Sequence, residues 1–108
     1  MEIDALIKEL KTGVLAMIKS TFDENSKAVQ NEVAAILKKS KERLERWTIL
    51  LTKKQLSKDE FVWLLQSQRD LYHMATLKAL GVSQIQLGHF KSKVLKFVAT
   101  TVFKFIGL

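Results

Sequence analysis

The sequence predicts an all-α protein, and three observations lead to this expectation. The chain has no proline and four glycines in 108 residues, so few residues can end a helix or form a tight turn. Apolar residues recur at spacings of three and four, which is the period of a helix. Ser-x-x-Glu and Ser-x-x-Gln patterns mark two helix starts. At 47% apolar and 27% charged residues, the composition predicts one globular domain over residues 1–108.

The first half of the chain predicts a long N-terminal helix over about residues 2–54. An apolar stripe with helical period runs through residues 3–22 and resumes after residue 36. The stretch between them is less apolar but keeps the period, and Thr21 with Glu24 matches a capping box that would begin a new helix. Two alternatives stay open: one long or kinked helix, or two helices with a break near residues 20–26.

The second half predicts an antiparallel helical hairpin, whose first arm is a helix over about residues 58–80. Ser57 is a favourable N-cap residue, and Glu60 three positions later completes a capping box. Gly81 follows as a C′ residue, because glycine accepts the left-handed conformation that ends many helices.

The second arm is a predicted helix over about residues 84–106, opened by a capping box of Ser83 and Gln86. Each arm would be about 35 Å long, whereas an unbroken helix over residues 2–54 would be about 80 Å long. The hairpin would then cover only half of the long helix. The resulting bundle-like fold therefore either breaks its first helix or leaves the N-terminal stripe to another molecule.

Apolar residues surround most of the C-terminal segment, residues 89–108, which carries four lysines and no acid. An amphipathic surface helix needs an apolar stripe only a little over 100° wide. We therefore expect the two chain ends to supply an apolar interaction surface made of Ile3, Leu6, Leu10, Val14, Met17, Phe90, Phe97, Phe103 and Phe105. The lysines expected to contact an anionic surface are Lys91, Lys93, Lys96 and Lys104.

The sequence carries little that indicates catalysis. There is no cysteine and no phosphate-binding glycine loop. Asp70 and His73 share a helix face as a general-base pair would, but no nucleophile accompanies them. Trp47 and Trp63 fall on apolar stripes, which favours core packing over base stacking. We predict no enzyme activity, no cofactor, no metal and no small-molecule substrate.

The leading hypothesis is a basic, non-enzymatic structural or interaction protein, a homo-oligomer or a partner of another helical protein, which docks through apolar helix faces. One alternative is a membrane-active protein whose basic amphipathic C-terminal helix binds a membrane surface. The net charge of +7 also suits a small nucleic-acid-binding protein, which is less favoured. Acidic Glu2 and Asp4 argue against a signal peptide, so we expect a cytoplasmic or membrane-peripheral protein.

Overall fold

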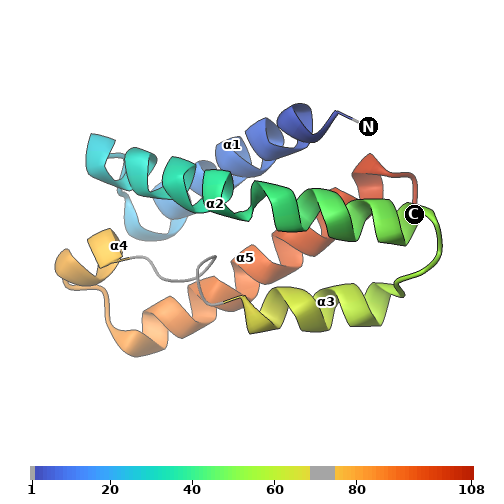
Figure 1. The fold of residues 1–108 in the computed structure, drawn as a ribbon. Helices are drawn as coiled ribbons and strands as arrows, with labels where there is room; N and C mark the ends of the chain where they lie inside the picture. The colour runs from blue at the N-terminus through green and yellow to red at the C-terminus, as the bar shows by residue number, and fades with distance from the viewer. Residues whose placement is uncertain (1, 69–74) are drawn as a thin grey trace.

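The computed structural model describes residues 2–68 and 75–108 and confirms the all-α prediction (Figure 1). No strand occurs among the described residues. The helices are α1 (Ile3–Phe22), α2 (Lys27–Thr52), α3 (Lys58–Ser67), α4 (Ala75–Ala79) and α5 (Gln84–Phe105).

Four of these helices form a closed ring in which α1 packs on α2, α2 on α3, α3 on α5 and α5 on α1. Successive long helices run in opposite directions, so the architecture is an up-down-up-down four-helix bundle (Figure 1). The bundle measures 42 × 25 × 21 Å. The short helix α4 packs on α2 near the end of the bundle where α5 begins.

The backbone breaks between α1 and α2, which decides between the two alternatives for residues 2–54. Asp23 takes a left-handed conformation with φ of 53°, and its N–H donates to the Lys19 carbonyl at 2.9 Å, ending α1. Ser26 caps α2 by accepting a hydrogen bond from the Val29 N–H at 3.3 Å. The new helix therefore begins after Ser26, whereas Thr21 remains inside α1. The chain reverses here, so α1 packs along α2.

The first arm of the hairpin differs from the single helix expected over residues 58–80. The capping box of Ser57 and Glu60 forms as expected, with both of its hydrogen bonds present. However, α3 ends at Ser67, because Gln68 has extended backbone angles. Residues 69–74 lie outside the described residues, and the next helix after them is α4.

The turn from α4 into α5 has the predicted glycine and the predicted cap. Gly81 has φ of 92°, and its N–H donates to the Lys78 carbonyl at 3.1 Å while the Val82 N–H donates to the Leu77 carbonyl at 3.2 Å. These two bonds form a Schellman motif. Ser83 and Gln86 then form the expected capping box at the start of α5.

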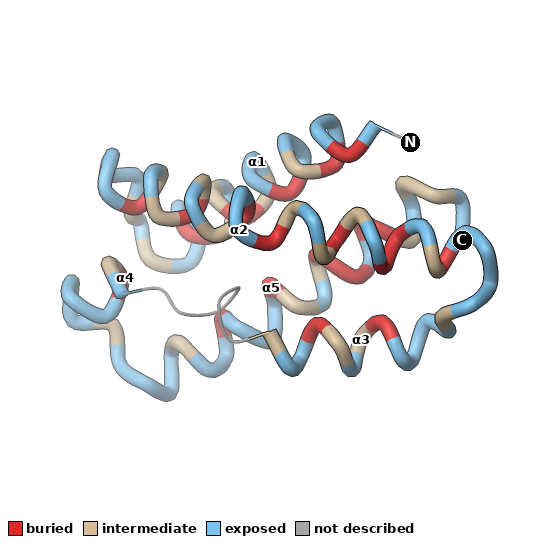
Figure 2. Tube along the Cα trace, in the orientation of Figure 1, coloured by how far each residue is buried: buried red, intermediate tan, exposed pale blue. Residues whose placement is uncertain are grey.

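The core runs along the axis of the bundle and takes one stripe from each long helix (Figure 2). Phe61 is completely buried and packs between Trp47 of α2 and Phe103 of α5, with ring centroids 6.3 and 5.6 Å away. At Gly13, α1 lies so close to α5 that an added Cβ would be 2.0 Å from the ring of Phe97. Because glycine has no side chain, α1 and α5 can approach this closely at Gly13.

Candidate interaction surface

The apolar residues expected to bind another molecule mostly form the core of this chain itself. Ile3, Leu6, Leu10, Val14 and Phe90 are buried. The remaining four, Met17, Phe97, Phe103 and Phe105, are partly buried and pack against that core. The physical reason is the break after α1, because it lets the two ends of the chain cover each other. In the folded chain, these five side chains are at most 8% exposed, so they offer little surface to a second molecule.

The lysines of α5 lie on the side of the helix that faces away from the bundle. Lys93, Lys96 and Lys104 are all exposed, and at 100° per residue they lie within about 80° of one another. The opposite side carries the buried Val94, Val98 and Val102. Phe97 and Phe103 flank the lysines and pack on α1 and α3.

One lysine of α3 extends this surface beyond α5. The Lys58 ammonium lies 5.4 Å from the centre of the Phe103 ring, which is a cation–π contact between the two helices. We call Lys58, Lys93, Lys96 and Lys104 the basic face. Lys91 was predicted to join them and is exposed, but it lies about 140° around α5 from Lys96 and is not part of this face.

The part of the basic face on α5 carries charge of one sign along the helix. From Lys93 to Lys104 it extends about 16 Å at the helical rise of 1.5 Å per residue. No aspartate or glutamate occurs in α5, so no acid of the same helix offsets these lysines. A surface of this kind attracts anions at a range set by the Debye length, about 8 Å at physiological salt.

Exposed aliphatic side chains lie beside the beginning of α5. Ile85, in the first turn, is 75% exposed, and Leu80 in the preceding turn is 52% exposed. The Ser83–Gln86 capping box fixes the backbone that joins Leu80 to the first turn of α5.

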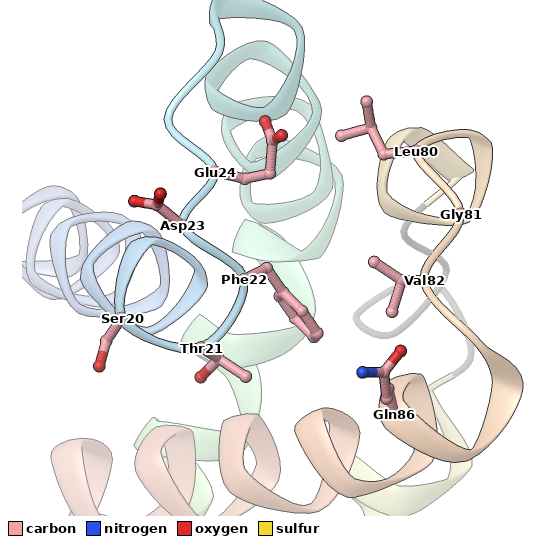
Figure 3. Close-up of a pocket in the computed structure, with 9 residues that line it drawn as sticks. All are labelled: Ser20, Thr21, Phe22, Asp23, Glu24, Leu80, Gly81, Val82 and Gln86. Carbon is pink, nitrogen blue, oxygen red and sulfur yellow. The ribbon is translucent and has the colours of Figure 1, made fainter.

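A shallow pocket of about 440 Å³ lies between this turn and the end of α1 (Figure 3). Phe22 and Val82 point toward one another across it, and Phe22 also packs edge-on against Phe90 of α5 with ring centroids 5.1 Å apart. The Gln86 side-chain oxygen accepts the capping hydrogen bonds from Ser83. The full lining is Ser20, Thr21, Phe22, Asp23, Glu24, Leu80, Gly81, Val82 and Gln86.

The two tryptophans have different environments. Trp47 is buried in the core, as the sequence predicted. The same prediction was wrong for Trp63, which is 66% exposed. Phe61 and Leu65 are one helical turn apart and take the inward side of α3, so Trp63 between them points outward. The exposed indole belongs to α3 and is not one of the residues of the basic face.

Two ionisable groups in the described ranges have shifted pKa values, and both act in the scaffold. The hydrogen bond to Asp4, 2.6 Å long, and the charge of that carboxylate raise the pKa of Lys41 and tie α2 to α1. Hydrogen bonds from the backbone N–H and then the hydroxyl of Ser57 lower the pKa of Glu60.

Within residues 2–68 and 75–108, no three histidine, cysteine, aspartate or glutamate residues are grouped as metal ligands would be. No helix of the described part is long and apolar enough to cross a bilayer. Asp70 and His73, the pair with general-base spacing, lie outside the described residues. Comparison of the chain with protein-family models, with curated proteins and with solved structures found no match.

Proposed function

We propose that this protein is a non-enzymatic interaction protein that binds an anionic partner surface through the basic face. The observation that carries the proposal is the orientation of α5, which packs its apolar side into the bundle and leaves Lys93, Lys96 and Lys104 exposed. The bundle positions these charges in a row, and nothing in the core needs them. The proposal keeps the expected class of protein and places its contact surface on the lysines of α5 that the sequence assigned to an anionic surface, instead of on the apolar residues of the chain ends.

The residue types of the basic face favour a diffuse anionic surface over a single anionic group. Its four cations are all lysines, and a lysine ammonium acts as a mobile point charge. Recognition of one phosphate or carboxylate usually employs arginine, whose guanidinium binds two oxygens at once. A row of lysines instead suits a partner with many negative charges, such as a membrane leaflet, a nucleic-acid backbone or an acidic protein.

Self-assembly of the chain remains a separate prediction. It no longer rests on the residues buried in the core, since these pack against one another. Light scattering over a range of protein concentrations measures the solution mass directly. A mass of 12.4 kDa at every concentration would contradict a homo-oligomer and would leave the basic face proposal intact.

Charge reversal in two places tests the proposed function. One variant combines Lys93→Glu, Lys96→Glu and Lys104→Glu. The matched control reverses three other exposed lysines, Lys38 and Lys39 of α2 and Lys53, which directly follows it, and gives the same net charge. Binding to anionic vesicles, to double-stranded DNA and to a polyglutamate resin is measured from low to moderate salt, and circular dichroism checks that both variants fold.

We expect the α5 variant to lose most of its binding to at least one of these surfaces. Each lysine near an anionic surface contributes about 1 kcal/mol, so reversing three should weaken binding by about 100-fold or more. The α2 control should lose much less. Equal losses in the two variants would show that net charge alone drives binding and would overturn the proposal, as would absence of wild-type binding to all three surfaces at low salt.

A further inference from the structure

We infer that the partner of the basic face is a membrane containing acidic lipids, and that Ile85 is the side chain that enters its apolar layer. This inference rests on the proposed function and names the partner of the same surface. It joins two observations made on different residues: a row of lysines on α5, and a 75% exposed isoleucine in the first turn of that helix.

Ile85 lies at the edge of the lysine arc that faces α3, because Phe103, eighteen residues later and at the same angle, packs on Phe61 of α3. Lys96 follows Ile85 by eleven residues, which places the two about 20° apart at 100° per residue, and Lys93 and Lys104 lie within about 100° of Ile85. Ile85 and Lys104 are about 28 Å apart along the helix. A flat surface can therefore contact Ile85 and the lysines together.

The first turn of α5 is built to hold Ile85 outward. Ser83 accepts from the Gln86 N–H at 3.2 Å, and the Gln86 side chain accepts from the Ser83 N–H at 3.1 Å. These bonds fix the backbone on both sides of Ile85 while its side chain stays in solvent. Burial of a full isoleucine side chain is favourable in any apolar medium, so a partner that supplies one gains affinity.

The combination of charges and side chain favours lipid over the other anionic surfaces. Phosphate groups of acidic lipids attract the lysines, and acyl chains accept an aliphatic side chain directly beneath them. Proteins that bind single-stranded nucleic acid use aromatic side chains to stack on bases. Aromatic residues of α5, such as Phe90, Phe97 and Phe103, pack in the bundle instead.

The experiment compares Ile85 with an isoleucine on the opposite side of the bundle. Ile49 of α2 is 41% exposed, and α2 and α5 occupy opposite corners of the ring of helices. Ile85→Ser and Ile49→Ser are therefore the same chemical change in two places. Co-sedimentation is measured with phosphatidylcholine vesicles with and without phosphatidylserine, beside retention on double-stranded DNA and on polyglutamate.

A site-specific label then reports insertion. Because the chain has no cysteine, Ile85→Cys and Ile49→Cys each accept one thiol-reactive fluorophore whose emission moves to the blue in apolar surroundings. With phosphatidylserine vesicles, we expect a blue shift at position 85 and none at position 49. We also expect Ile85→Ser to bind these vesicles about tenfold more weakly than Ile49→Ser.

The outcomes separate the inference from the proposed function. Binding to phosphatidylserine vesicles with a blue shift at position 85 supports both. Binding to the vesicles without a shift, or with equal losses for the two serine variants, overturns the role of Ile85. Retention on DNA or polyglutamate without vesicle binding overturns the membrane partner and leaves the proposed function standing. Failure to bind any of these surfaces overturns both.

Discussion

Gly13 offers the most direct test of how α1 and α5 pack. Substitution Gly13→Ala adds a Cβ that would lie 2.0, 2.5 and 2.8 Å from three ring atoms of Phe97. Carbon atoms in contact are about 3.5–4.0 Å apart. The ring, or the helix that carries it, must therefore move by more than about 1 Å.

Two opposing effects set the size of the change. Alanine is favoured over glycine inside a helix by up to about 1 kcal/mol. Forcing an extra carbon into packed space costs about 1–3 kcal/mol. Phe97 is only partly buried, so its ring has some freedom to turn, which lowers the cost. We expect Gly13→Ala to lower the free energy of unfolding by about 0–2 kcal/mol, the difference between these two effects.

Gly88 provides the matched control for the propensity effect. It lies inside α5 and is exposed, and a Cβ added there meets nothing within 4 Å. Gly88→Ala should therefore raise the free energy of unfolding by up to about 1 kcal/mol. Urea denaturation followed by circular dichroism measures both variants, and we expect Gly13→Ala to be less stable than Gly88→Ala by about 1–3 kcal/mol.

A second substitution tests whether the cost arises from Phe97. Phe97→Leu removes the ring atoms that an alanine at position 13 would meet. In a double-mutant cycle, Gly13→Ala should cost less in the Phe97→Leu background, with a coupling of about 0.5–3 kcal/mol. Equal stabilisation by Gly13→Ala and Gly88→Ala, with no coupling to Phe97, would show that α1 and α5 do not approach closely at this point.

Two further predictions concern the connections between helices. Thr76 donates through its N–H and hydroxyl to the Glu32 carboxylate at 3.0 and 2.7 Å and so joins α4 to α2. Thr76→Val should lower the free energy of unfolding by about 1–2 kcal/mol and speed amide exchange in α4. Unchanged exchange would contradict the anchoring role. Ser57 lowers the folded-state pKa of Glu60. The ionised Glu60 carboxylate therefore stabilises the folded protein above the unfolded-state pKa, and this stabilisation disappears as the pH falls through the lower folded-state pKa. In urea titrations, wild type should exceed Glu60→Gln in stability at neutral pH and the gap should close in acid; a gap independent of pH would refute the charged capping box.

Local signals in the sequence predicted the helix boundaries where a single side chain decides them. Ser57 and Ser83 accept hydrogen bonds from backbone N–H groups three residues later, and Gly81 takes a positive φ. These contacts lie within a few residues of the chain, so the amino-acid types predict them. The polar arc of α5 was predictable for the same reason, because helical period alone places Lys93, Lys96 and Lys104 on one side.

Other features depended on contacts between distant segments. Because α3 ends at Ser67, α4 packs against part of α2 in its place. Glu32 of α2 binds α4 through Thr76, which is 44 residues away. Trp63 was misplaced because α3 is short and two residues, Phe61 and Leu65, already supply its buried side. The end of α3 does not follow from residues near in sequence, since it depends on which helix faces the segment. The position of Trp63 could have been predicted, because helical period places it opposite Phe61 and Leu65.

The sequence by itself determined that this protein is helical, where most of its helices begin, and that its last helix is basic on one side. Tertiary structure decided which apolar surfaces remain free. The left-handed backbone at Asp23 reverses the chain, so the apolar ends become a shared core and only the lysine side of α5 stays outside. A stripe of apolar residues predicts that something will cover it, whereas the path of the backbone determines whether the cover is another molecule or the same chain.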